Sequence, residues 1–364
     1  MTQAEPLTPL PDQQLSPMAQ RFAGATTPAN LRQAAARGKA MLPPPDLLIA
    51  IYQAAAYSEA AADLETAKLA RDTTATLDEK LVRAGLQGHN MPAVVLDFLA
   101  RAQHGQRWAV ELFLRHRNTA DRTIEFLASV CGTEDLELIA QDEQRLLQAP
   151  GVIAALYMNP KARASTALRA VELAARNGVV VDIPGFEDVV AALSNVKLTA
   201  ADDAKFQAAV ESGKAVVTSE PELDPDKVTQ EDVEHIQATE EAKTAAPAPQ
   251  EEEVKTRFED LPVPHQIRLA TLGTAFDRSI AIRSTIRTVA MAAIRSPAVR
   301  PNEAMKYAGN RALHEDVIRY IANKKDWCQL AAIRLALINN NKTPLGVALR
   351  FLPFLHQRDL KGVS

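Results

Sequence analysis

Short amphipathic segments with typical helix boundaries follow one another along almost the whole chain. Ser16 and Pro17 form one such boundary, because serine is a preferred N-cap residue and proline suits the first helical turn. Gly24 stands at the end of the same segment, where a helix commonly stops. Helices this short are marginal in isolation and must bury their apolar faces against one another. The sequence therefore predicts an all-α fold.

The composition agrees with this fold class. Aromatic residues make up 5% of the 364 residues, and only 14 residues are glycine. These values disfavour β-sandwiches and propellers, and also the nucleotide-binding folds that depend on glycine-rich loops. The length corresponds to two or three domain-sized units.

Changes in composition along the chain predict four segments. They are a disordered N-terminus (1–17), an N-terminal helical solenoid (18–215), an acidic disordered linker (216–257) and a basic C-terminal helical solenoid (258–364). The first and third contain several prolines and few large apolar residues, so they cannot bury enough surface to offset their ordering entropy. A short helix over about residues 230–243 remains possible within the linker.

The charge is distributed very unevenly. The net charge of −4 comes from 41 basic and 45 acidic residues. Residues 217–260 hold 14 acidic and 4 basic side chains, a net of −10, whereas residues 261–364 hold 16 basic and 6 acidic side chains, a net of +10. An acidic tract joined to a basic block indicates electrostatic partners.

Internal similarity points to two related copies of one helical arrangement. Residues 159–173 align with residues 340–354 at an offset of 181, and both contain the tripeptide Ala-Leu-Arg. Glu134 and Asp135 align with Glu315 and Asp316 at the same offset. Shorter spacings occur within each copy: 41 residues from Leu127 to Leu168, 43 from Pro301 to Pro344, and an irregular step of 28 from Leu96 to Ile124.

The Asn-Pro and Thr-Pro corners between these segments would end one helix and preset the next, because proline restricts its own φ and the residue before it. Paired helices with a period near 40 residues resemble HEAT and armadillo repeats. Residues 333–352, IRLALINNNKTPLGVALRFL, also resemble the bacterial leucine-rich-repeat variant, whose units read V-R-x-x-V-A-x-N-P-x-T-P-x-x-x-L-x-x-L. The resemblance covers about half the chain, in two patches.

This resemblance implies an α-solenoid of irregular HEAT-like helical hairpins in two related copies. The chain departs from the family in its irregular spacing, and it lacks the clustered cysteines that hold an iron–sulfur centre in one known member. No such centre is expected. A solenoid needs a polar cap at its end, and the short stretch before Ser364 leaves open whether the last helix is covered, binds a partner or is truncated. The oligomeric state also remains open.

Cysteine use and the N-terminal sequence predict a reduced, cytoplasmic protein with no membrane insertion. Cys131 and Cys328 lie far apart, and we interpret both as small core residues rather than a disulfide framework. The first 17 residues carry an acid and several prolines where a signal peptide has basic and apolar residues. The most apolar early run, residues 47–57, is too short to cross a bilayer.

No familiar catalytic or cofactor-binding motif is present, so we expect no enzymatic activity, no cofactor and no metal. His314, Glu315 and Asp316 come nearest to a metal cluster, but adjacent helical residues point in different directions, and acids favour a helix N-terminus. Cys131 and His116 are the nearest pair to a nucleophile and base, and no motif joins them.

The basic C-terminal block holds the candidate binding residues. We expect one helix from about His265 to Ser296, with three arginines on an arc beside its apolar face and further cations in the following turns. The candidate partner-binding residues are Arg283, Arg287, Arg295, Arg300, Arg311, Lys324 and Lys325. Arginine suits carboxylates and phosphates. The alternative is a solvated helix face whose charge is balanced by the acidic linker.

The sequence thus favours a non-catalytic interaction scaffold or adaptor that binds the acidic surface or peptide of a partner protein through this basic block. Nucleic-acid binding is the alternative, although stacking aromatics and groove-reading motifs are missing. An enzyme with a site between the two copies is a third hypothesis. We also expect residues 251–253, three glutamates, to occupy the basic face until a partner displaces them.

Overall fold

The computed structural model describes residues 6–87, 90–194, 199–215, 232, 235, 238, 239 and 249–354. Across these residues it contains 23 α-helices and no strand, so the prediction of an all-α protein is confirmed. The chain divides into two compact units, Met1–Ala162 and Arg163–Ser364, called here the N-terminal and C-terminal units.

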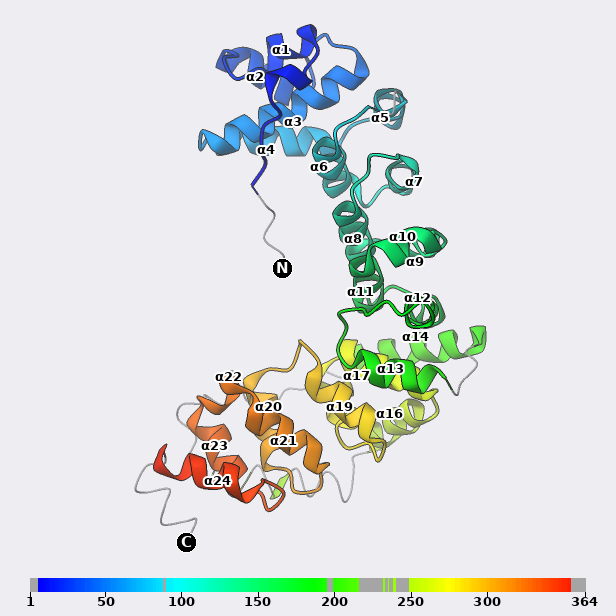
Figure 1. The fold of residues 1–364 in the computed structure, drawn as a ribbon, viewed down its shortest axis with the longest axis vertical. Helices are drawn as coiled ribbons and strands as arrows, with labels where there is room; N and C mark the ends of the chain where they lie inside the picture. Colours follow the sequence, from blue (N-terminus) through cyan, green and yellow to red (C-terminus); the bar gives the residue numbers. More distant parts are fainter. Residues whose placement is uncertain are drawn as a thin grey trace. The chain divides into compact units, whose positions relative to one another are not determined.

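In its described residues, the N-terminal unit has a short 3-10 helix, Asp12–Gln14, followed by eleven α-helices (Figure 1). These are α1 (Pro17–Ala23), α2 (Ala29–Ala36), α3 (Pro44–Ala60), α4 (Leu64–Ala75), α5 (Glu79–Leu86), α6 (Ala93–Gln103), α7 (Arg107–Arg115), α8 (Asp121–Val130), α9 (Thr133–Ile139), α10 (Glu143–Gln148) and α11 (Pro150–Met158). The expected start of α1 is confirmed, since the Ser16 hydroxyl accepts a hydrogen bond from the Ala19 amide at 3.1 Å.

Helices of this unit lie in two rows. α3 contacts α1, α2, α4 and α5, and the row α6, α8, α11 follows it, each helix in contact with the next (Figure 1). The helices α5, α7 and α9 form the second row, and α6 contacts α7 just as α8 contacts α9. The apolar stripes of both rows meet between them, where Val95, Val110 and Leu127 are fully buried.

The described part of the N-terminus, from Pro6 onward, differs from the disorder expected for residues 1–17. Leu10 is 7% exposed, and its backbone N–H and C=O are both hydrogen-bonded to the side-chain amide of Gln53 in α3. Leu15 is also buried. Residues 6–10 have no helical pattern of their own, and polar side chains of α3 take up their backbone hydrogen bonds.

The C-terminal unit contains twelve described α-helices of at least four residues (Figure 1). These are α12 (Ala164–Arg176), α13 (Phe186–Leu193), α14 (Ala200–Ala215), α16 (Pro249–Glu259), α17 (Val263–Leu272), α18 (Ala275–Ala281), α19 (Arg287–Arg295), α20 (Pro301–Gly309), α21 (Glu315–Asn323), α22 (Lys325–Cys328), α23 (Ala331–Ile338) and α24 (Leu345–Phe351), with a final 3-10 turn at Leu352–Phe354.

Helix α17 is the centre of this unit, with every residue from Pro264 to Thr271 buried. It contacts α12, α13 and α14, the last of which ends at Ala215, well before α17 begins at Val263, as well as α18 and α19. The division between the two compact units therefore falls at Ala162, not within residues 216–257 as expected, because α12–α14 share their core with the later helices.

The expected disordered linker ends earlier than residue 257. Residues 249–259 form α16, which contacts α14 and α18 and buries the Phe258 side chain. The three glutamates 251–253 belong to this helix, so they are not part of a free tether, and their side chains lie outside the described residues. Almost all of residues 216–248, including most of the possible helix over 230–243, also lies outside them.

The single helix expected from His265 to Ser296 is wrong, because three helices cover this range. Gly273 ends α17, and Thr274 then starts α18 through a capping box with Asp277. The turn after α18 runs to Ile286, the N-cap of α19. A threonine followed three residues later by an acid is itself a start signal for a helix, and this local preference overrides the continuous apolar spacing.

A recurring corner follows several helices of eight or nine residues. The side chain at the C-cap, or at the residue after it in the case of Asn340, accepts a hydrogen bond from the backbone N–H two residues later, at 2.8 to 3.3 Å, and thereby turns the chain toward the next helix. The residues in this role are His116, Asn159, Ser296, Asn310 and Asn340. Two of them, Asn159 and Asn340, are the corners that the internal alignment pairs.

Candidate interaction site

The seven cationic candidates are distributed over several elements of the C-terminal unit, and the three arginines expected on one helix do not share one. Their positions are the turn after α18 (Arg283), the two ends of α19 (Arg287, Arg295), the N-cap of α20 (Arg300), the α20–α21 corner (Arg311), the C-cap of α21 (Lys324) and the first residue of α22 (Lys325).

Arg287 and Arg295 are held in ion pairs within the unit. The Arg287 guanidinium contacts the Asp316 carboxylate, and this hydrogen bond is the main reason why the pKa of Asp316 lies below its ordinary value. Arg295 donates to Asp188 in α13 at 2.8 Å. Arg287 keeps 62% of its side chain exposed, so its pair is screened by solvent and adds little stability.

Arg283 and Arg311 donate to backbone carbonyl groups near helix ends. Arg283 Nε bonds to the Ser279 carbonyl at 2.7 Å, and Arg311 Nη2 bonds to the Asn339 carbonyl at 3.2 Å. Lys342 donates to the Leu313 carbonyl in the corner between α20 and α21, 2.6 Å away. The last carbonyls of a helix lack partners within it and carry partial negative charge, so these cations stabilise helix ends and their corners.

Lys324 lies over the ring of Trp327, with Nζ 3.7 Å from the ring centroid. Trp327 itself is buried, so this cation–π contact covers the outer edge of an aromatic anchor. The candidates whose side chains are exposed are Arg287, Arg300, Arg311 and Lys325.

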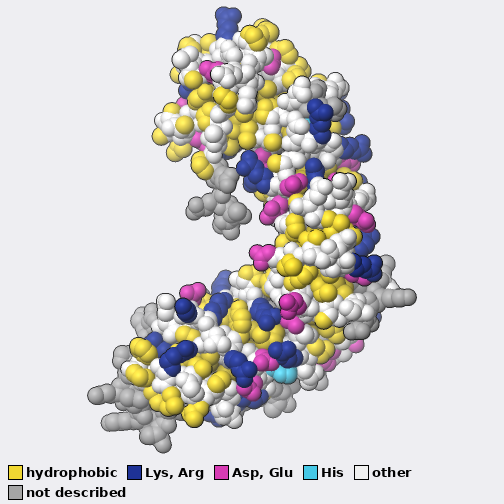
Figure 2. All heavy atoms as spheres, in the orientation of Figure 1, with side chains coloured by type: hydrophobic (Ala, Val, Ile, Leu, Met, Phe, Trp, Pro, Cys, Tyr) yellow, Lys and Arg dark blue, Asp and Glu magenta, His cyan; other side chains and the backbone are white. Residues whose placement is uncertain are grey.

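Acidic side chains lie among the basic ones on this surface. On the face of the C-terminal unit shown in Figure 2, Lys and Arg side chains alternate with Asp and Glu and with apolar side chains. Asp316 illustrates this pattern, since it lies between Arg287 and Arg319. The local field on this face is therefore weaker than the net charge of residues 261–364 alone would produce.

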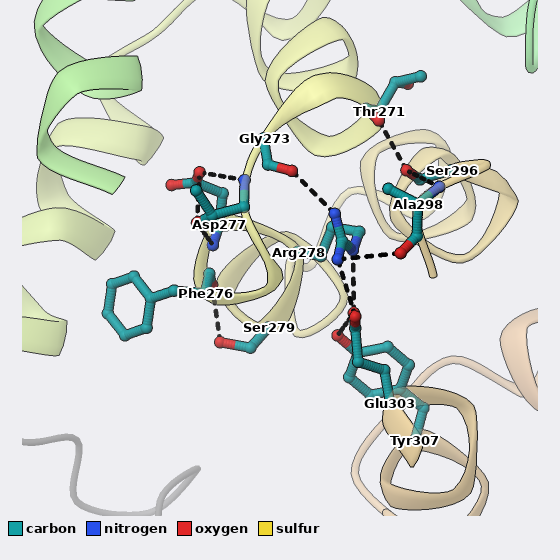
Figure 3. A network of polar contacts seen from close by, with 11 residues as sticks. Thr271, Gly273, Phe276, Asp277, Arg278, Ser279, Ser296, Ala298, Glu303 and Tyr307 are labelled. Carbon is teal, nitrogen blue, oxygen red and sulfur yellow. Dashed lines mark hydrogen bonds and ion pairs between the residues drawn. The ribbon is translucent and has the colours of Figure 1, made fainter. Parts of the chain in front are cut away.

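Arg278 is a buried cation of this unit that is not among the seven candidates taken from the sequence. Its guanidinium donates to both carboxylate oxygens of Glu303, at 2.8 and 2.9 Å, and to the carbonyls of Gly273 at 2.8 Å and Ala298 at 3.3 Å (Figure 3). The Arg278 side chain is 5% exposed and the Glu303 side chain 15%. The pair joins α18 to α20. An arginine inside an apolar stretch was the only sequence signal for it.

Asp277 occupies a tight buried position beside this network. Its carboxylate accepts hydrogen bonds from the Thr274 amide at 2.7 Å and the Thr274 hydroxyl at 2.9 Å, and burial raises its pKa (Figure 3). A Cβ atom at Gly213 in α14 would clash with this carboxylate. Glycine at residue 213 thus permits the close approach of α14 to α18.

A second buried polar cluster joins α12, α14 and α17. His265 is fully buried, and its Nε2 lies 3.9 Å from an oxygen of Asp203. Asp203 accepts hydrogen bonds from the Ser165 amide at 2.8 Å and its hydroxyl at 2.5 Å. Desolvation lowers the pKa of His265, while Asp203 acts in the opposite direction. The Ser165 hydroxyl is bonded to the carboxylate rather than to the imidazole, so this arrangement is not that of a catalytic triad.

The Cys131 and His116 pair does not have the geometry of a nucleophile and base. The Cys131 thiol lies 3.7 Å from the His104 carbonyl oxygen, and burial raises its pKa to about 12. His116 Nδ1 accepts a hydrogen bond from the Asn118 amide at 3.2 Å. A thiol with so high a pKa is protonated at neutral pH and is a poor nucleophile.

His314, Glu315 and Asp316 form the start of α21, as interpreted from the sequence. His314 is the N-cap, and the two carboxylates bind Arg319 and Arg287. Among the residues that the structure describes, no three His, Cys, Asp or Glu side chains are placed to hold a metal ion.

None of the helices in the described ranges has the length and apolar character needed to span a membrane. Comparison of the chain with known protein families, curated proteins and solved structures gave no match.

Proposed function

We propose that the protein is a non-catalytic interaction scaffold, an α-solenoid of irregular HEAT-like hairpins in two related copies, that binds an acidic partner protein through its basic C-terminal helices. The observation that carries the proposal is a repeated pattern of helix contacts. α8 contacts α9 and α11, and α10 contacts α11; α20 contacts α21 and α23, and α22 contacts α23.

Both sets of helices contain the same corner residue. Asn159 follows α11 and Asn340 follows α23, and each lies at the position expected from the offset of 181 residues. The two rows of helices in the N-terminal unit add a second line of support. Stacked pairs that contact only their neighbours leave extended surfaces, and proteins of that architecture commonly use these surfaces for binding.

The exposed candidates Arg287, Arg300, Arg311 and Lys325 supply the chemistry for an acidic partner. Arg287 already binds a carboxylate, that of Asp316, at an exposed position. A carboxylate of a partner could replace it at little cost, because exposed ion pairs contribute little free energy. Cys131 and Cys328 are both free thiols, in keeping with a proposed cytoplasmic location.

The test compares the full chain with two variants that each reverse three charges. The test variant carries Arg287→Glu, Arg300→Glu and Lys325→Glu. The control carries Arg169→Glu, Arg176→Glu and Lys214→Glu, which are exposed residues of α12 and α14 in the same unit. We expect affinity purification to recover a protein with an acidic surface from the wild type and the control, and to lose it with the test variant.

Equal recovery from all three baits would contradict the proposal. A titration with duplex DNA separates the alternative function. If the chain binds DNA with an affinity that falls steeply with salt, and the test variant reduces the slope, nucleic-acid binding is the better assignment.

A further inference from the structure

The N-terminal segment 6–10 is bound to α3 through its backbone. Tyr52 donates its hydroxyl to the Thr8 carbonyl at 2.6 Å. Gln53 donates to the Leu10 carbonyl at 2.9 Å and accepts from the Leu10 amide at 2.8 Å. Glu59 accepts from the Leu7 amide at 3.1 Å. Contacts of this kind recognise an extended chain largely independently of its side chains.

The sequence of this segment suits such a surface. Residues 6–11 read PLTPLP, so a leucine recurs at the third residue, as it would on one face of a polyproline II helix. Pro11, which follows the segment, has φ −64° and ψ 144°, the values of that conformation. Leu10 is buried and Leu7 half-buried, whereas Pro6 and Thr8 are exposed. Polyproline II has no internal hydrogen bonds, so all its carbonyls are available to α3.

A groove continues from this segment along α4, α6, α8 and α11. Its volume is about 770 Å³, within the range of roughly 300 to 1,000 Å³ that is usual for ligand sites. Pro6, Leu7 and Thr8 line one part of it, and Val94, Phe98 and Phe126 contribute apolar surface. Each of α4, α6 and α8 adds one arginine and one carboxylate: Arg71, Asp72, Asp97, Arg101, Arg122 and Glu125.

This lining favours a peptide over a polyanion. The three cations are matched by three anions, so the groove offers donors for peptide carbonyls and acceptors for peptide amides without a net charge. Arg101 is held in position by Asp97 at 2.8 Å and lies 4.3 Å from the centroid of the Phe126 ring. Groups fixed in this way lose little entropy when a ligand binds.

We propose that α3 and the adjoining groove form a binding site for an extended, proline-containing peptide of a partner protein, with leucine at every third position. Residues 6–10 of this chain occupy the α3 part of the site when the partner is absent. Every group involved lies within the N-terminal unit, so the site is independent of the cationic residues proposed to bind an acidic partner.

The probe is a fluorescent peptide with the sequence of residues 1–12, MTQAEPLTPLPD. It is titrated against the full chain and against a variant that lacks residues 2–11. We expect saturable binding to the deletion variant and at least tenfold weaker binding to the full chain, because the tethered segment competes at an effective concentration of about a millimolar. A peptide with Leu10→Asp should bind neither protein.

The contribution of the groove is tested in the deletion variant with Arg122→Ala and Glu125→Ala, which together leave the net charge unchanged. This pair should weaken binding of the 12-residue peptide more than binding of a peptide limited to residues 6–12. The matched control is Glu79→Ala with Arg83→Ala, an exposed ion pair on α5, which should change neither affinity.

A second variant keeps the test decisive if the deletion prevents folding. In the full chain, Leu10→Ala weakens the internal contact, and we expect several-fold tighter binding of the 12-residue peptide. The absence of binding to a folded deletion variant, or the absence of any gain with Leu10→Ala, would overturn the proposal. Dimerisation of the full chain that the deletion abolishes would identify a second copy of the chain as the occupant and would also overturn it.

Discussion

Asn159 and Asn340, which are 181 residues apart, make equivalent sets of hydrogen bonds. Each side-chain amide donates to two backbone carbonyls of an earlier corner, at 2.7 to 3.2 Å. Each also accepts from the backbone N–H two residues later, at 2.9 and 3.0 Å. Both side chains are 2% exposed, so these bonds replace water for backbone groups that would otherwise be buried unpaired.

Replacement of either asparagine by alanine should destabilise the protein. Asn159→Ala and Asn340→Ala each leave buried carbonyls without a donor, at a cost of about 1 to 3 kcal/mol. Denaturant unfolding measures the loss, and hydrogen exchange locates it in the helices around the altered corner. Asn341→Ala, at an exposed neighbouring residue, is the control and should have almost no effect. An equal effect at all three positions would remove the corner explanation.

Removal of one partner of the Arg278–Glu303 ion pair should lower the free energy of unfolding much more than replacement of both partners by apolar residues. Arg278→Met leaves a mostly buried carboxylate without its cation and should cost about 3 to 5 kcal/mol of unfolding free energy. The double variant with Glu303→Leu should be less destabilised than the sum of the single changes. Arg319→Met, which breaks an exposed pair with Glu315, serves as the comparison and should cost about 1 kcal/mol or less.

His265 should make stability depend on pH. Burial lowers its pKa below the unfolded value of 6.5, so the unfolded chain takes up a proton before the folded chain does. The stability contribution is therefore complete above about pH 6.5 and is lost as the pH falls through the lower folded pKa. Asp203, Asp202 and Arg268 are the charged groups that act on this imidazole.

Unfolding free energies measured between pH 8 and pH 5 test this dependence. The wild-type value should fall as the pH drops below about 6.5, and His265→Phe should flatten the curve in that interval. His314→Gln, at a half-buried residue of the same unit, should leave the wild-type curve unchanged. Equal slopes for the wild type and His265→Phe in this interval would show that His265 does not titrate differently in the two states.

The Cys131 thiol should be almost unreactive in the folded protein. It is 2% exposed and its pKa is about 12, so both access and thiolate formation are suppressed. In a Cys328→Ser background, alkylation at pH 8 should proceed at least about a hundredfold more slowly in the native chain than in denaturant. Comparable rates in the two states would mean that the N-terminal unit opens readily around α8.

Local signals in the sequence predicted local structure well. Ser16, Pro17 and Gly24 mark the ends of α1 as expected, since capping depends on neighbouring residues alone. Thr274 and Asp277 are a helix-start signal of the same kind. The apolar spacing continues past them in the sequence and predicted one long helix, whereas the structure has three helices there. A hydrophobic stripe shows which face is buried but not where the backbone turns.

Tertiary contacts explain the remaining differences. The order of residues 6–10 depends on Gln53, more than forty residues away, and nothing in their own composition shows it. For the seven cationic candidates, the sequence showed the residue type and the positive charge of the block that contains them. The sequence could not show that Asp188 lies beside Arg295, because these two residues are 107 positions apart.

The spacing of contacts in the structure was also closer to the irregular 28-residue step than to the spacings of 41 and 43 residues. Hydrogen bonds between neighbouring corners and helices repeatedly join residues 25 to 32 positions apart. The spacings of 41 and 43 residues seen in the sequence are longer than the distance over which these contacts operate. Proline positions recur with the corners, but not every corner has one.

Because the corner hydrogen bonds join residues only about thirty positions apart, they limit which insertions and deletions the fold can accept. Each corner depends on the one formed about thirty residues earlier, so inserting a whole corner-to-corner segment supplies a new donor together with a new acceptor. Loss of a single helix would instead leave the side-chain amide of one corner and the backbone carbonyls of another without hydrogen-bond partners. Growth or loss by complete segments therefore disturbs the fewest buried hydrogen bonds.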